Sequence, residues 1–354
     1  MTSASAVPTV DWDLAVAAAV RLSPRPPKLG RGEIAEVVGE LRGAARTAQE
    51  HVRAHTGLVA PAGASSVAVV DREGWIRANA AGFEAVMDPL VERIAAKRKG
   101  PGATPAAALV GGALTGAEAG GLLAFMSGKV LGQFEVFGPQ EAGRLLLVAP
   151  NVVTVERELE VDPHDFRLWV CLHEETHRVQ FGVAPWLREH LLGQLEGFVD
   201  DVELDAAAAV RRLWAVLRAV SAAVRGKEGL SLVEAVQTPA QRESLARVTA
   251  VMSLLEGHAD VVMDGVGPAV VPSVEQIREK FQRRRTQPTR QQSVARSLLG
   301  MDAKLRQYRD GAVFVRGALE RVGMEGFNRV WESPETLPLP HEIADPAAWV
   351  ARTA

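Results

Sequence analysis

Apolar residues recur every three or four positions over much of the chain, which is the spacing of one face of a helix. The stretch 23–30, with three prolines, should be an extended connector that ends a first short helix, because the residue before a proline disfavours the helical conformation. Further helices are predicted over 32–55, over 83–97 after a turn at 71–74, and over 202–224, 239–262 and 290–322. We therefore expect a mainly α-helical protein.

Two short apolar runs, 65–70 and 144–149, predict strands of a small β-sheet. The second ends at Pro150-Asn151, a pair typical of turns, and we expect the strand to precede directly the helix predicted over 166–181. It fits either an edge strand that pairs with an extended peptide or an internal strand of the sheet. The Gly- and Ala-rich stretch 100–121 has weak periodicity and fits either a loosely packed helix pair or a loop.

Composition and charge narrow the class of protein. The chain has 354 residues, 47% of them hydrophobic and 23% charged, which is typical of a globular protein with one broad or two smaller domains. We divide it into a mostly helical region at 1–143 and a catalytic region at 144–354. The net charge of -3 gives no electrostatic reason to expect nucleic acid or a membrane as partner. The basic run 283–285 has no aromatic residues among its cations, so we interpret it as a solvated loop.

The single cysteine, Cys171, bears on the cellular compartment. One cysteine excludes an intramolecular disulfide and a cysteine-rich zinc site, and it fits a reducing environment. The first nine residues lack the basic start and apolar stretch of a secretory signal, and no later run has the length of a membrane span. We expect a cytoplasmic protein in which Cys171 is a small core residue.

The clearest chemical signal is the sequence His-Glu-Glu-Thr-His at 173–177, inside a helix predicted over 166–181. A helix places His173 and His177 on one face, where two imidazoles can hold one zinc ion. Glu174 then reaches a zinc-bound water, whose pKa zinc lowers to roughly 7, and acts as its general base. Glu175 is expected to face away from the metal. The alternative, two ordinary histidines on an amphipathic helix, is less favoured because the full motif falls on a predicted helix.

A catalytic zinc ion needs a third protein ligand, and Glu256 is the candidate. It shares one face of its predicted helix with Asp260 and Asp264, and three acidic residues in line should have positive groups facing them. His258 is the competing ligand, but it lies about 200 degrees around the helix from Glu256, so only one of the two can bind. The neighbouring Gly257 would let this helix approach the motif helix closely.

Three further groups have candidate roles around the metal. Asp260 is expected to accept the second ring N–H of one motif histidine and so fix its tautomer. Tyr308, the only tyrosine, is a candidate donor to the oxyanion of a tetrahedral intermediate, and the alternative is a core tyrosine with a satisfied hydroxyl. Arg188 and His190 follow the motif helix and are more consistent with surface groups than with substrate contacts.

The motif at 173–177, with the distant Glu256-Gly257-His258-Ala259, resembles the zincin-like hydrolases common in actinobacteria. The resemblance extends over nearly the whole chain, through the segments 10–12, 147–151, 166–170 and 304–308. In particular it is similar to the branch associated with biosynthesis of a deazaflavin coenzyme. The resemblance implies a zincin-like metalloprotease fold in which two histidines and a glutamate bind zinc.

These observations favour a zinc-dependent hydrolase, metallopeptidase-like, that cleaves a peptide or small amide with Glu174 as general base. Two alternatives are a noncatalytic zinc-binding scaffold linked to coenzyme biosynthesis and an amidohydrolase of a small metabolite. Glu174 favours catalysis, because a structural zinc site does not require it. A long groove beside a free strand edge would favour peptides, and a closed cavity would favour a small molecule.

Overall fold

The computed structural model describes residues 10–60, 66–97, 105–138, 140, 143–200, 238–286 and 301–354, with the backbone alone at 91–97, 105–114, 198–200, 285–286 and 301–309. The described helices are α1 (Trp12–Leu22), α2 (Arg31–Thr56), α3 (Arg72–Lys97), α4 (Pro105–Ser127), α5 (Ala149–Leu159), α6 (Pro163–Val183), α7 (Trp186–Asp200), α10 (Pro239–Val266), α11 (Val274–Thr286), α13 (Met301–Phe327) and α14 (Pro346–Thr353). Three 3-10 turns, η1 (Asn328–Trp331), η2 (Pro334–Thr336) and η3 (Glu342–Ala344), join α13 to α14. None of the described helices is long and apolar enough to cross a membrane.

A three-stranded sheet of β1 (Ser66–Val70), β2 (Gly132–Glu135) and β3 (Arg144–Val148) has the order β1-β3-β2. β3 pairs in parallel with β1 and antiparallel with β2. It is therefore the central strand, and the alternative that β3 forms an edge is wrong. Its central position explains the unbroken apolar run of β3. A strand that is buried on both faces does not need polar residues at alternate positions. The strand β2, which the sequence analysis did not predict, is an edge strand of the described sheet.

The helix α5 stands between β3 and the motif helix α6, so the expectation that the strand leads directly to that helix is wrong. Pro150 lies in the first turn of α5, where its missing N–H breaks no helical hydrogen bond. Asn151 is buried, and its side-chain amide donates to the carbonyls of Ser127 and Val130. The Pro-Asn pair thus begins a helix here.

Three other segments differ from expectation in detail. The basic run 283–285, interpreted as a solvated loop, lies in α11, where Arg283 is exposed. The predicted turn at 71–74 is the start of α3, where the Asp71 carboxylate accepts the N–H of Gly74 and caps the helix. Of the stretch 100–121, for which a helix pair or a loop was expected, residues 105–121 belong to the single helix α4, and the rest lie outside the described residues. The predicted segment 202–224 and the start of 290–322 lie outside the described residues.

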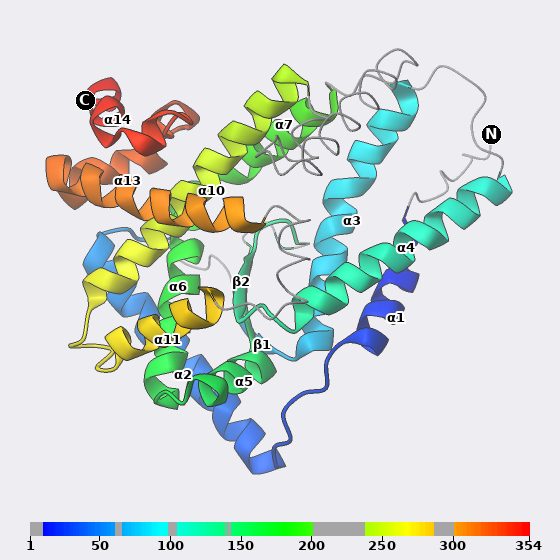
Figure 1. Ribbon diagram of the computed structural model, residues 1–354, viewed down its shortest axis with the longest axis horizontal. Coiled ribbons are helices and arrows are strands. Elements are labelled where there is room, and N and C mark those ends of the chain that lie inside the picture. The colour runs from blue at the N-terminus through cyan, green and yellow to red at the C-terminus, as the bar shows by residue number, and fades with distance from the viewer. Residues whose placement is uncertain are drawn as a thin grey trace, which may run out of the picture.

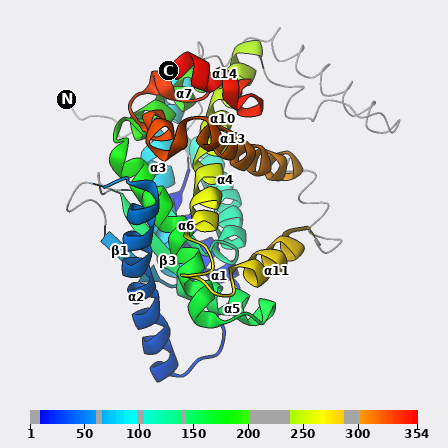
Figure 2. The same cartoon turned by 90° about the vertical axis from the view of Figure 1, so that its left-hand side faces the viewer.

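Three apolar cores hold these elements together. One lies among α2, α5, α6, α11 and β3, a second among α7, α10, α13 and α14, and a third among α1, α3, α4 and the sheet. In Figure 1 α6 and β2 lie near the middle of the molecule, with α1, α3 and α4 on one side and α2, α10 and α13 on the other. The sheet contains strands from both sides of residue 143, so the two regions proposed from the sequence meet within one sheet. The helix α10 belongs to the second core, also adds Val262 and Met263 to the first, and contacts α6, α7 and α13 (Figure 2).

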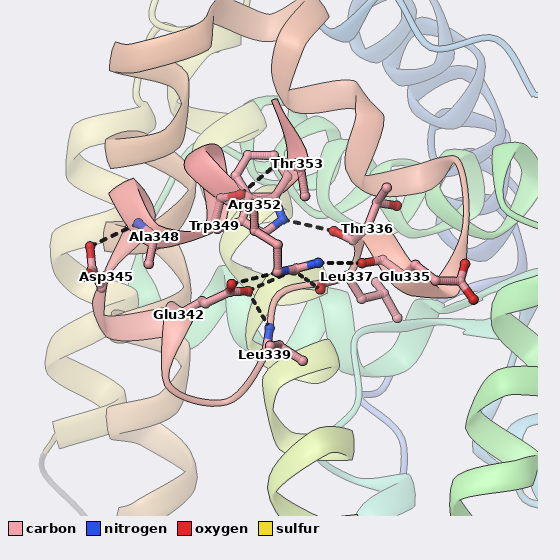
Figure 3. Close-up of polar contacts among 10 residues, drawn as sticks. All are labelled: Glu335, Thr336, Leu337, Leu339, Glu342, Asp345, Ala348, Trp349, Arg352 and Thr353. Atoms are coloured by element: carbon pink, nitrogen blue, oxygen red, sulfur yellow. Dashed lines mark hydrogen bonds and ion pairs between the residues drawn. The ribbon is translucent and has the colours of Figure 1, made fainter.

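The C-terminal segment is fixed by one buried carboxylate, that of Glu342, which is 2% exposed. Arg352 donates to both of its oxygens, at 2.7 and 2.8 Å, and the N–H of Leu339 donates to one of them at 2.8 Å (Figure 3). Burial alone raises the pKa of Glu342, but these hydrogen bonds and the Arg352 charge outweigh it, so its pKa lies below the usual value. Arg352 also donates to the carbonyls of Glu335 and Leu337, which ties η2 to α14.

We predict that Arg352→Leu lowers the free energy of unfolding by about 2 kcal/mol at pH 7, because it leaves a buried carboxylate without its charged partner. Since the pKa of Glu342 is depressed in the folded protein, this stabilisation is present above the unfolded-state pKa and is lost as the pH falls through the folded-state pKa. The deficit of the variant should therefore shrink in acid.

Urea denaturation of both proteins at pH 7 and below about pH 4 measures these differences. Arg321→Leu is the matched control, because Arg321 is exposed and donates only within its own helix among the contacts described. Its effect should stay within about 0.5 kcal/mol. An equal deficit for both variants at pH 7, or a deficit for Arg352→Leu that grows in acid, would contradict the assigned role of Glu342.

Candidate metal centre

The motif helix α6 starts at a strong signal, since Asp162 caps it by accepting the N–H of Asp165 and Pro163 occupies its first turn. Most of α6 is buried, and its exposed side carries His173 and His177. Their Nε2 atoms lie 3.2 Å apart, so both rings direct the same nitrogen to one point. The structure therefore places the two histidines as the spacing predicts.

The third candidate ligand comes from α10, a helix that begins with a capping box of Thr238 and Gln241. A carboxylate oxygen of Glu256 lies 3.5 Å from Nε2 of His173 and 3.9 Å from Nε2 of His177. One ligand atom from each of these three residues lies within 4.8 Å of the other two. Two imidazole nitrogens and one carboxylate oxygen form a donor set that suits zinc, so the residues fit the metal that the motif implies.

These side chains are partly exposed, 26% for His173, 14% for His177 and 22% for Glu256, and they open into a pocket of about 310 Å³. The rest of the described lining comes from β2, the segment after it, α6, α7 and α10. It consists of Gly132, Gln133, Phe134, Val136, Phe137, Glu174, Phe181, Leu191, Met252 and Leu255. The three donor groups thus face a space that a small molecule or part of a chain can enter.

Glu174 is buried and lines the same pocket. Desolvation raises its pKa well above the usual value, and the nearby charge of Glu256 raises it further. Gly132 of β2 lies against it, because a Cβ on Gly132 would come within 2.5 Å of the Glu174 side chain. A glycine at the start of β2 therefore leaves the space that the Glu174 side chain occupies.

A model of the zincin-like metallopeptidase family matches residues 10–350, nearly the whole chain. The chain belongs to the zincin-like metallopeptidase family. The crystal structure of "a putative hydrolase with a novel fold" from Chloroflexus aurantiacus is 30% identical and has a TM-score of 0.70, over 97% of this chain and 98% of that one. No curated protein matches the chain. These similarities agree with the mainly α fold and small sheet described above.

The wall of the zincin pocket that β2 provides was not predicted from the sequence. Gln133 is held by α3, because Trp75 donates to its side-chain oxygen at 2.9 Å and its amide donates to Asn79 at 2.9 Å. Phe134 stacks on Phe181 of the motif helix, with 5.6 Å between ring centroids. Four residues are too few to show the period of a strand, so β2 could not be predicted from the pattern of apolar residues.

Gln180 is a second residue that the sequence analysis did not single out. It is fully buried, and its side-chain oxygen lies 2.9 Å from Nδ1 of His177. Its amide nitrogen lies 2.9 Å from the carbonyl oxygen of Leu255 and 3.0 Å from Nδ1 of His258, both on α10. A polar residue between the apolar Val179 and Phe181, three positions after a motif histidine, is the sequence signal that would have found it.

His258, the competing third ligand, points away from the donor cluster. It is fully buried against the rings of Phe327 and Trp331, at centroid distances of 5.5 and 5.3 Å. Desolvation lowers its pKa to about 3, with smaller contributions from His177 and His55, so the ring is neutral at physiological pH. Among the residues described, Glu256 is therefore the member of α10 that joins the two motif histidines.

The acidic face of α10 meets positive groups, as the sequence analysis expected. Arg278 and Arg316 form ion pairs with Asp264, the second at 2.6 Å. Burial lowers the pKa of Arg278, and the carboxylate of Asp260 acts on it in the opposite direction. Gln180 already contacts Nδ1 of His177. A hydrogen bond from the second ring N–H of a motif histidine to Asp260 therefore stays a prediction for His173 alone.

The remaining candidates around the motif are accounted for by other contacts. Glu175 is buried and forms an ion pair with Arg178. Cys171 is a buried core residue whose thiol lies against the carbonyl of Leu41, and burial raises its pKa. Arg188 is half-buried and donates to the carbonyl of Val136, at 3.0 Å.

Two further predicted residues have no assigned contact to the ligand cluster. His190, which is half-buried, stacks edge-on against Trp186. Tyr308 lies in α13, but its side chain is outside the described residues, so its role as oxyanion donor stays a prediction.

The position of Glu256 depends on a close crossing of α10 with α13. A Cβ on Gly257 would overlap the backbone of Gly311, and a Cβ on Gly311 would overlap the carbonyl of Ser253. The prediction that Gly257 allows approach to the motif helix is therefore wrong, because the helix that meets it is α13. Two facing glycines let the helix backbones touch, which fixes α10 from the side opposite α6.

We predict that Gly257→Ala destabilises the protein by about 2 kcal/mol and weakens metal binding, because α10 must move away from α13. Gly193→Ala is the matched control, since Gly193 is an exposed helical glycine with no atom within 4 Å of an added Cβ, and it should stabilise by up to about 1 kcal/mol. Thermal unfolding of both variants measures the difference. If the two alanines have the same effect, the helix crossing is looser than described.

Proposed function

We propose that the protein is a zinc-dependent hydrolase that cleaves an amide or peptide bond, with zinc held by His173, His177 and Glu256. The observation that carries this proposal is the convergence of three ligand atoms within 4.8 Å of one another, at a pocket that Glu174 also lines. A structural zinc site is closed by four protein ligands, whereas a catalytic one keeps a position open for water or substrate. Three donors facing a pocket fit the catalytic kind.

When bound, zinc supplies Lewis acidity, which polarises a carbonyl group and makes a bound water acidic. The chain itself supplies the proton acceptor, which we assign to Glu174. Its burial and the charge of Glu256 raise its pKa, and a carboxylate with a raised pKa holds a proton more firmly once it has accepted one. The contact with Gly132 holds this carboxylate at the pocket wall.

The lining of the pocket favours substrates with an apolar group beside the scissile bond. Seven of its described residues are apolar, namely Phe134, Val136, Phe137, Phe181, Leu191, Met252 and Leu255. No lysine or arginine occurs among the described lining residues, so an acidic group such as a glutamyl carboxylate would find no cationic side chain of these types there besides the metal itself. The edge strand β2 borders this pocket, and its main chain can pair with an extended peptide. We therefore favour a peptide with an apolar side chain as the substrate over a small amide that carries an acidic group.

The resemblance to the branch linked with a deazaflavin coenzyme supports a small amide as the second candidate substrate. A pocket of about 310 Å³ is at the lower end of the size of small-molecule sites, which agrees with this alternative. We also propose a cytoplasmic protein without nucleic acid or membrane partners, which the single cysteine and the small net charge of -3 support. A noncatalytic zinc scaffold is the third possibility, and the Glu174 variant described below separates it from both hydrolases.

We predict that the purified protein binds one zinc ion per chain and that Glu256→Ala weakens zinc binding by more than about 100-fold, because it removes one of three ligands. Competition with a chelator measures the affinity. Glu243→Ala is the matched control, since Glu243 is an exposed glutamate on the same helix, and its affinity should equal that of the wild type. Zinc content that survives the double change His173→Ala and His177→Ala would refute the metal assignment.

We predict that Glu174→Gln retains zinc and the fold but lowers hydrolytic turnover by about 100- to 10,000-fold, because the amide cannot accept a proton. Incubation of wild type and variant with a library of peptides and small amides, read by mass spectrometry, finds the substrate and measures turnover. Products that depend on Glu174 support the hydrolase, and their length and side chains decide between peptide and small amide. If neither the wild type nor Glu174→Gln yields products above the protein-free background, the scaffold interpretation replaces the hydrolase. Equal turnover by both would remove Glu174 as the general base.

A further inference from the structure

We propose that Gln180 is a positioning residue that sets the ring tautomer of His177, and that Leu255 and His258 of α10 set the direction of the Gln180 amide. The inference deepens the proposed function, because its purpose is to present Nε2 of His177 to the metal. The tautomer itself is a property of the metal-free protein. It can therefore be tested whether or not zinc binds as proposed.

The direction of the Gln180 amide follows from the groups at its two ends. Its nitrogen lies 2.9 Å from the carbonyl oxygen of Leu255, a group that accepts hydrogen bonds and cannot donate. The reverse orientation would set two oxygens against each other in a fully buried place, which is strongly unfavourable. The NH2 group must therefore face α10, and the side-chain oxygen must face His177.

The tautomer of His177 then follows from the same reasoning. Nδ1 of His177 lies 2.9 Å from the Gln180 oxygen, which only accepts, so Nδ1 carries a proton. A neutral imidazole has one N–H, and Nε2 is left with its lone pair. That is the nitrogen 3.2 Å from Nε2 of His173 and 3.9 Å from the Glu256 carboxylate, where the ligand atoms converge.

His258 contributes the second acceptor for the Gln180 amide. Its Nδ1 lies 3.0 Å from the Gln180 nitrogen, so the neutral ring carries its proton on Nε2. That Nε2 is buried between aromatic rings and has no hydrogen-bond partner among the described residues. A buried N–H without a partner is unfavourable, and an apolar ring would avoid it. The bond from Gln180 to Nδ1 is the polar contact that accounts for a histidine at this position.

The first experiment uses the metal-free wild-type protein labelled with ¹⁵N, in which long-range ¹H–¹⁵N correlations distinguish protonated from bare imidazole nitrogens. We expect His177 to carry its proton on Nδ1 and His258 on Nε2. A His177 ring with its proton on Nε2 overturns the proposal. This measurement needs no variant, so it decides the question even if substitutions at Gln180 prevent folding.

The second experiment compares Gln180→Leu with Gln49→Leu, which replaces an exposed glutamine of α2. Gln180→Leu should populate the Nε2–H form of His177 and weaken the affinity for zinc, measured by chelator competition, by about 10- to 100-fold. Gln49→Leu should change neither. An unchanged tautomer or an unchanged zinc affinity in Gln180→Leu overturns the positioning role.

His258→Phe separates the two anchors of the amide, because it keeps an aromatic ring in the core and removes the Nδ1 acceptor. We expect a smaller loss of zinc affinity than in Gln180→Leu, since Leu255 still directs the amide. A larger loss of zinc affinity in His258→Phe than in Gln180→Leu contradicts the proposal that Leu255 alone can direct the Gln180 amide. If wild-type His177 has the expected tautomer while zinc does not bind at His173, His177 and Glu256, the proposed function fails and the inference about the ring stands.

Discussion

The packing of α10 against α6 is the constraint on which the metal centre depends. Two ligands four residues apart on one helix need only a regular helix, but the third comes from a separate helix that must have the right rotation and height. Gln180 makes this contact specific, since its amide reaches the carbonyl of Leu255 and the ring of His258. A shift of α10 by one residue would leave these buried polar groups unpaired, so the hydrogen bonds select one register.

The opposite side of α10 carries the second half of this constraint. Gly257 lets α13 approach, and Phe327 and Trp331 close around His258 just beyond it. The C-terminal segment then covers that cluster, with Trp349 packed against Phe314 and Phe327. Because α10 is held between α6 and this layer, residues near the C-terminus contribute to the placement of Glu256 without touching the pocket. Their effect on the metal centre should therefore act through the helix position.

Sequence reasoning reached the parts of the site that depend on one helix at a time. The spacing of His173 and His177 and the acidic face around Glu256 are properties of local periodicity, and the structure brings these residues together. Sequence reasoning did not predict β2 or the role of Gln180, and it assigned Gly257 to the wrong partner helix. These features depend on which elements meet in space. The helix α5 was missed because Pro150-Asn151 fits a turn as well as a helix start.

Glu174 shows why the proposed chemistry would depend on the contact of α6, α10 and β2. A carboxylate is ordinarily exposed, but here the backbone of Gly132 covers it and the charge of Glu256 lies near it, and both effects disfavour its ionised form. A divalent cation held by Glu256 and the two histidines, as proposed, would reverse the electrostatic contribution, since it would offset the negative charge that Glu174 faces. The proton affinity of Glu174 would then be coupled to occupation of the site. Burial by β2 would raise that affinity and the cation would lower it, and the proposed general base requires an affinity between the two extremes.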